Sequence, residues 1–119
     1  MSSEELSEQG SNHYEQKDFQ KAIDKFSQAI KREPNNDTYY HKRANSYYSQ
    51  NNFQKAIEDY TQAIRIKPDN ATYYNYRGHA YYRQNNFQKA IEDYTQAIRL
   101  DPNNSEAYEY RGYAQSKLE

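Results

Sequence analysis

The chain contains no cysteine and no tryptophan, and it has only three glycines and three prolines among its 119 residues. Without cysteine it can form no disulfide framework, no cysteine-based zinc site and no thiol nucleophile. No apolar run approaches the roughly twenty residues that a membrane-spanning helix needs. The polar, acidic N-terminal segment is unlike a signal or transit peptide. These absences favour a cytoplasmic protein.

Neither sign of charge dominates the sequence. Sixteen basic residues stand against seventeen acidic ones, which gives a formal net charge of −1. No cluster of Lys and Arg rises above this even distribution, so the sequence predicts no nucleic-acid interface and no membrane-surface partner. Hydrophobic residues make up only 34% of the chain, but its fifteen tyrosines supply apolar area with a polar tip.

The most informative feature is an internal repeat. Residues 50–65 and 84–99 are identical over sixteen positions, QNNFQKAIEDYTQAIR, at an offset of 34. A degraded copy lies 34 residues earlier, over 18–30. A fixed period in this range is typical of stacked helical repeats, in which each unit buries its apolar face only against its neighbours. The lean hydrophobic content fits such a thin, elongated stack.

Two helices are expected in each full unit, because apolar and aromatic residues recur at spacings of three and four. Asn51-Asn52 and Asn85-Asn86 can reverse the chain between them, since Asn tolerates the left-handed backbone. Asp18 is the expected N-cap in the first unit, and Ser2 with Glu5 predicts a capping box. The seven expected helices are 3–16, 19–32, 37–50, 53–66, 71–84, 87–100 and 105–118.

These spacings resemble those of the tetratricopeptide repeat family. The motif positions are held by Leu6, Gln9, Gly10, His13, Ala22, Phe26, Ala29 and Pro34 in the first unit, by Tyr40, Arg43, Ala44, Tyr47, Ala56, Tyr60, Ala63 and Pro68 in the second, and by Tyr74, Arg77, Gly78, Tyr81, Ala90, Tyr94, Ala97 and Pro102 in the third. The resemblance implies an all-α, right-handed α-solenoid of antiparallel helix pairs, with one domain over 1–119, repeats at 3–36, 37–70 and 71–104, and a capping helix at 105–118. The near-identity of two units is also compatible with a designed, consensus-like array.

Two packing expectations follow from these positions. The small residues Gly10, Ala44 and Gly78 should let helix backbones approach closely, with aromatic rings filling the flanking space. The chain carries Arg where the family usually has Leu, and we expect ion pairs between repeats, Asp59–Arg77 and Asp93–Arg111. In the first interface Lys25 would face Arg43, so that pair should be missing.

No catalytic grouping is present in the sequence. His13 occupies a packing position, and His41 with His79 would supply only two ligands to a metal. The three glycines stand alone within helices, so no phosphate-binding loop exists. We therefore expect no enzymatic activity, no metal and no cofactor.

The resemblance implies a concave groove, lined by the first helices of the repeats, that holds an extended or helical peptide. We expect Tyr76 and Tyr110 to be exposed in it, and Tyr48 and Tyr82 to belong either to the groove or to the core. The expected groove residues are Ser7, Ser11, Tyr14, His41, Lys42, Asn45, Tyr48, Asn75, Tyr76, His79, Tyr82, Arg83, Glu109, Tyr110 and Tyr113.

The scaffold resembles co-chaperones that clamp the acidic C-terminal tails of heat-shock chaperones, but the clamp itself is absent. Ser7, Ser11, Lys42, Thr72 and Tyr76 stand at the positions where the resemblance implies Lys, Asn and Arg. Only Lys42 offers a positive charge, so strong binding of such a tail is not expected. The sequence thus predicts a protein-interaction module for a peptide of unknown identity. The alternative is a structural or engineered scaffold with no dedicated ligand, either monomeric or weakly self-associating.

Overall fold

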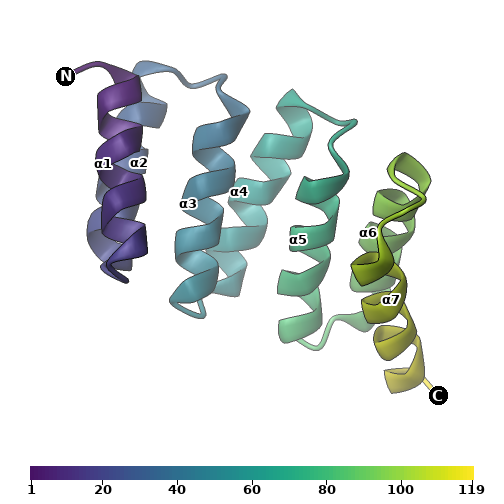
Figure 1. Cartoon of the computed structure of the whole chain (residues 1–119). Coiled ribbons are helices and arrows are strands. Elements are labelled where there is room, and N and C mark those ends of the chain that lie inside the picture. Colours follow the sequence, from purple (N-terminus) through teal and green to yellow (C-terminus); the bar gives the residue numbers. More distant parts are fainter.

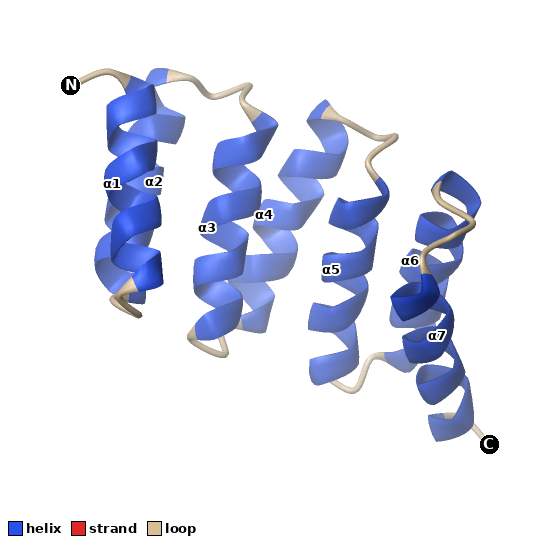
Figure 2. Cartoon of the chain, in the orientation of Figure 1, coloured by secondary structure: helices blue, strands red, loops and turns tan.

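The computed structural model describes all 119 residues, and it contains seven α-helices and no strand (Figures 1 and 2). The second helices of the three repeats begin and end at the predicted residues, whereas the first helices and the last helix end one residue earlier than predicted. The helices are α1 (Ser3–Glu15), α2 (Phe19–Arg32), α3 (Asp37–Ser49), α4 (Phe53–Ile66), α5 (Ala71–Arg83), α6 (Phe87–Leu100) and α7 (Ser105–Lys117).

The turn inside each repeat explains why the first helices end where they do. Asn51 adopts a left-handed backbone with φ 63°, and its N–H donates to the carbonyl of Tyr48 at 2.9 Å. The N–H of Asn52 donates to the carbonyl of Tyr47 at 2.9 Å, which completes a Schellman motif. The side chain of Asn52 then accepts the N–H of Lys55 and caps α4. Two adjacent asparagines therefore end one helix and begin the next.

The other repeats use the same turn with one change of residue. Asn85 and Asn86 repeat the arrangement between α5 and α6, while Lys17 and Asp18 form it between α1 and α2. The predicted capping box of Ser2 and Glu5 is present at the start of α1. Local sequence chemistry thus sets the helix boundaries throughout the chain.

The helices form a row in which each one packs against the next (Figure 1). The odd-numbered helices α1, α3, α5 and α7 line the side facing the viewer, and the even-numbered helices lie behind them. The molecule is elongated, with dimensions of 50 × 25 × 20 Å. This is the arrangement of an α-solenoid built from antiparallel helix pairs. No helix combines the length and the apolar character needed to cross a bilayer.

Small residues bring the two helices of a repeat into close contact, as predicted. A Cβ atom placed on Gly10 would lie 2.6 Å from the ring of Phe26, and one placed on Gly78 would lie 2.8 Å from the ring of Tyr94. Ala44 occupies the equivalent place in the second repeat and packs in the core cluster that contains Tyr60. Aromatic rings therefore fill the space that the small residues leave.

The predicted ion pairs between repeats are wrong, because each pair forms within one repeat. Arg43 donates two hydrogen bonds of 2.8 Å to Asp59, and Arg77 does the same to Asp93. Arg43, for which no ion pair with the preceding repeat was predicted, is paired with Asp59 of its own repeat. The physical reason is that this face of the first helix lies against the second helix of its own repeat, sixteen residues later in the chain.

The same arginines nevertheless reach the preceding repeat. A further guanidinium N–H of Arg43 donates to Ser27 at 3.1 Å, and Arg77 donates to Thr61 at 3.1 Å. Each of these two side chains thus joins three helices, with its carboxylate partner in its own repeat and a hydroxyl partner in the repeat before.

Candidate functional site

Three hollows lie along the side of the molecule formed by α1, α3 and α5. The first has a volume of about 460 Å³ and lies between α1 and α3, the second measures about 180 Å³, and the third, of about 290 Å³, extends to α5. The first and second share Ser11 and Lys42, and the second and third share Tyr14 and Asn45. Because they share lining residues, the three hollows form one continuous surface, which we call the inner groove.

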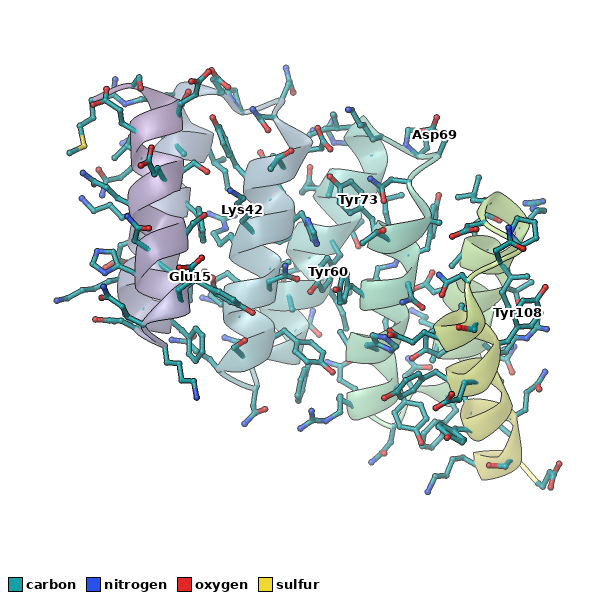
Figure 3. The ribbon with its side chains drawn as sticks, in the orientation of Figure 1. Glu15, Lys42, Tyr60, Asp69, Tyr73 and Tyr108 are labelled. Atoms are coloured by element: carbon teal, nitrogen blue, oxygen red, sulfur yellow. The ribbon has the colours of Figure 1, made fainter.

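One end of the inner groove holds a single lysine among acidic residues. Lys42 Nζ donates to the hydroxyls of Ser11 at 3.1 Å and Ser7 at 3.4 Å. Glu4, Glu8 and Glu15 line the same two hollows. Figure 3 shows Glu15 and Lys42 on the viewer's side of α1 and α3. The ammonium group is thus bonded to two serine hydroxyls, and three glutamates line the same part of the groove.

Tyr60 of α4 forms part of the floor of the inner groove. The Tyr60 ring is buried, and its hydroxyl donates to Asn45 Oδ1 at 2.5 Å. Asn45 Nδ2 lies 3.3 Å from His41 Nε2. Burial raises the pKa of Tyr60 and lowers the pKa of His41, so the hydroxyl stays a donor and the imidazole accepts as a neutral ring. This chain of hydrogen bonds fixes the side chain of Asn45.

The third repeat builds the same feature with different residues. The hydroxyl of Tyr94 lies 2.7 Å from His79 Nδ1, and His79 Nε2 lies 2.6 Å from Glu106 Oε1 on α7. With the proton on Nε2, the ring donates to the carboxylate and accepts from the tyrosine. The hydrogen bond from His79 lowers the pKa of Glu106. His79 therefore links the core of its repeat to the last helix.

The residues involved change together from repeat to repeat. The first repeat has Phe26 without a hydroxyl, and Ser11 at the position of Asn45 and His79. Where the ring gains a hydroxyl, the position on the first helix gains a long polar side chain that bonds to it. Aligning the three units at the offset of 34 therefore reveals that the ring hydroxyl and its polar partner change together. The motif alone places Tyr60 and Tyr94 only in the core.

The inner groove includes about half of the residues predicted for it. Ser7, Ser11, Tyr14, Lys42, Asn45, Tyr48, Tyr76 and His79 line the three hollows, and the predicted residues His41, Asn75, Tyr82, Arg83, Glu109, Tyr110 and Tyr113 do not. Sequence reasoning missed seven lining residues, which are Asn12, Phe26, Asn36, Thr38, Tyr39, Ser49 and Tyr60. The motif assigns Phe26 and Tyr60 to packing, and the structure shows that both pack in the core and line the groove.

The tyrosines predicted for the groove differ in their exposure. Tyr76 is 38% exposed, and its ring lies nearly parallel to that of Tyr60 at 6.1 Å. Tyr110, expected to be exposed, is instead half-buried with its ring 4.6 Å from that of His79. Tyr48 and Tyr82 are half-buried, each with its ring edge against a phenylalanine of its own repeat. Tyr76 is therefore the most accessible aromatic side chain of the inner groove.

Other predicted residues form contacts outside the three hollows. Asn75 is buried and donates to Glu106 at 3.1 Å, and Tyr113 donates to Glu109 at 3.0 Å. The guanidinium of Arg83 lies 4.8 Å from the ring centre of Phe53.

The rings of His41 and His79 take part in aromatic packing and in hydrogen bonds. The Tyr76 ring lies between His41 and His79, with centroid distances of 5.6 and 6.0 Å. No group of three or more His, Asp and Glu side chains is arranged to hold a metal ion.

Comparisons with known proteins agree with this architecture. The model of the tetratricopeptide repeat family matches residues 7–71, 41–105 and 76–116. No curated protein sequence matches the chain significantly. Among solved structures, the TPR domain of Arabidopsis OM64 has a TM-score of 0.91 and 32% identity, covering 96% of this chain and 94% of that one.

Two further structures are similar over nearly the whole chain. The first TPR domain of Spaghetti (RPAP3), bound to the HSP90 peptide SRMEEVD, has a TM-score of 0.94 and 26% identity, and the alignment covers 98% of this chain and 92% of that one. The TPR domain of Sgt2 from Aspergillus fumigatus has a TM-score of 0.90 and 25% identity, covering 98% of this chain and 78% of that one. Such domains are protein-interaction modules rather than enzymes. With its family match, its helix pairs and its packing positions, the chain belongs to the tetratricopeptide repeat family.

Proposed function

We propose that this protein captures an extended or helical peptide along the inner groove. The observation that carries the proposal is the continuity of the three hollows, which share lining residues from Lys42 to Tyr76. Tyrosine and asparagine suit such recognition, because they combine rigid apolar area with adaptable hydrogen bonds.

The lining favours a particular pattern of side chains in the ligand. An apolar or aromatic side chain fits the third hollow against Tyr14, Tyr48 and Tyr76. One acidic or amide group can accept from Lys42, and a basic residue beyond it would face Glu4, Glu8 and Glu15.

Internal hydrogen bonds hold the polar groups of the groove before any ligand arrives. Asn45 and His79 are fixed by the hydroxyls of Tyr60 and Tyr94, and Lys42 by two serines. Fewer side chains then lose freedom on binding, which favours affinity.

The similar Spaghetti structure with its bound HSP90 peptide supports peptide capture as the use of this scaffold. The residues here nonetheless favour another ligand. Ser7, Ser11, Thr72 and Tyr76 offer no cation where the resemblance to chaperone-binding relatives implies a carboxylate clamp. Two carboxylates at the end of a chaperone tail would meet Lys42 alone.

A random peptide library panned against the immobilised protein tests the proposal. Tyr76→Ala is the matched variant and Tyr108→Ala its control, because both tyrosines are exposed and Tyr108 lines none of the three hollows. We expect a consensus peptide that is lost on Tyr76→Ala and kept on Tyr108→Ala. The peptide SRMEEVD should bind at least about tenfold more weakly than the consensus.

The scaffold alternative makes the opposite prediction. No enrichment on the unaltered protein, or a consensus that Tyr76→Ala leaves intact, would reject groove binding. Sedimentation equilibrium would then test self-association, since a scaffold that stacks end to end gains mass with concentration.

A further inference from the structure

Three residues of the last helix are the same as those with which α5 contacts the second helix of its repeat, α6. Tyr108, Arg111 and Gly112 of α7 stand at the positions of Tyr74, Arg77 and Gly78 in α5. In α5 these three residues lie against α6. In this structure no helix packs over the three residues of α7, and together they form a surface that we call the end face.

The preceding repeats show what such a surface receives. Arg77 forms two hydrogen bonds of 2.8 Å to Asp93, and the ring of Tyr94 fills the space over Gly78. Arg43 bonds in the same way to Asp59, which directly precedes the buried Tyr60. In both repeats the occupant is a helix in which an aspartate is followed at once by a tyrosine.

The end face has the same residue types, but no helix packs against it. Arg111 keeps the bond to the preceding repeat, with 3.4 Å to Thr95, and its guanidinium lies 5.4 Å from the Tyr108 ring centre. It forms no ion pair, and a Cβ atom on Gly112 would meet nothing within 4 Å. Tyr108 is 45% exposed, and Figure 3 shows it on the outer side of α7. The arginine is thus already oriented for a carboxylate.

We propose that the end face binds an amphipathic helix of a partner protein that carries an Asp followed immediately by an aromatic residue. The carboxylate would pair with Arg111, and the ring would lie over Gly112 beside Tyr108. This surface is separate from the inner groove and does not depend on the function proposed for it.

A second copy of this chain is a poor source of that helix. Its own Asp59 and Asp93 are each only 5% exposed, because both are held by arginines of their repeats. Gln115 and Ser116 of α7 are polar and exposed, where Tyr81 and Tyr82 of α5 pack in the core. The contact therefore centres on the first three turns of α7.

The probe is a fluorescein-labelled synthetic peptide with the sequence of residues 84–100, which contains Asp93 and Tyr94. The intact protein is titrated into it, and binding is followed by fluorescence anisotropy, with amide chemical shifts locating the contact. The variants are Gly112→Leu and Arg111→Gln in the protein and Asp93→Asn in the peptide. Gly112 is exposed and unconfined, so the Leu variant keeps its fold, which circular dichroism checks.

We expect saturable binding with shifts confined to α7, weakened about tenfold by Arg111→Gln or by the Asn peptide, and lost with Gly112→Leu. Absence of saturation up to about 1 mM protein would overturn the proposal. Binding that Gly112→Leu leaves unchanged would also overturn it, because the peptide would then occupy the groove or displace α6. If the protein alone self-associates and Gly112→Leu abolishes this, a second copy covers the end face and the partner assignment is wrong.

Discussion

Gly78 and Gly112 hold equivalent positions in their helices but face different neighbours. A side chain on Gly78 would collide with the ring of Tyr94, whereas one on Gly112 would meet nothing. We expect Gly78→Leu to lower the free energy of unfolding by about 1–3 kcal/mol through overpacking. Gly112→Leu should instead raise it, by up to about 1 kcal/mol, because Leu favours a helix more than Gly does. Urea unfolding followed by circular dichroism measures both, and equal effects would contradict the packing argument.

Lys17 is a second residue whose backbone conformation affects the stability of the protein. It adopts φ 63° in the turn where the other repeats have Asn51 and Asn85. A left-handed backbone is unfavourable for most side chains but is tolerated by Asn. We expect Lys17→Asn to stabilise the protein by about 0.5–1 kcal/mol, seen as a higher thermal midpoint. The reverse change, Asn51→Lys, should lower the midpoint, and a rise there would refute the explanation.

At the scale of the helices, the arginine–aspartate pairs join the two halves of a repeat. Burial raises the pKa of the Asp93 carboxyl, and the hydrogen bonds from Arg77 oppose that rise. Removal of the arginine therefore leaves a buried carboxylate without its partner. A double-mutant cycle with Arg77→Ala and Asp93→Ala should give a coupling energy of about 1–3 kcal/mol in chemical unfolding.

The cycle has an internal control in the pair that the sequence suggested. Asp59 and Arg77 belong to different repeats and form no ion pair, so their coupling should stay below about 0.5 kcal/mol. A larger coupling for Asp59 and Arg77 than for Asp93 and Arg77 would show that the pairs form between repeats.

At the scale of the whole molecule, His41 makes folding stability depend on pH. Its ring packs against Tyr73 and Tyr76 of the next repeat. Burial lowers its pKa below the ordinary value of 6.5, the nearby Asp37 raises it, and Lys42 lowers it further. The unfolded chain therefore binds the proton more readily than the folded one. Stability contributed by the neutral ring is present above pH 6.5 and is lost as the pH falls through the folded pKa.

This gives a measurable expectation for the unaltered protein. Between pH 7.5 and about pH 5 the free energy of unfolding should decrease, and His41→Gln should flatten that dependence because Gln does not titrate. Urea unfolding at several pH values measures the slope. His13→Gln serves as the control, since His13 is half-buried on α1 and forms none of the ring contacts of His41. An unchanged slope in His41→Gln would assign the pH dependence to other groups.

The amino-acid sequence by itself determined the helices, their order and the close packing within each repeat. The 34-residue period is visible in the sequence itself, and the Asn and Asp caps act over a few neighbouring positions. The small residues stand at matching positions in the repeats, so all three features can be predicted without knowing the fold. The turn at Lys17 is also local, since Lys17 adopts the same left-handed backbone as Asn51 although Lys is less suited to it.

Only the tertiary structure decided which side chains meet across helices. Arg77 reaches Asp93 rather than Asp59 because the face it occupies is set by the crossing of two helices, which no spacing along the chain reports. Tyr60 belongs to both core and groove because its ring and its hydroxyl lie in different surroundings. For the same reason, whether a predicted residue such as Tyr110 lines the groove or packs under it depends on the neighbours that the stack brings to it.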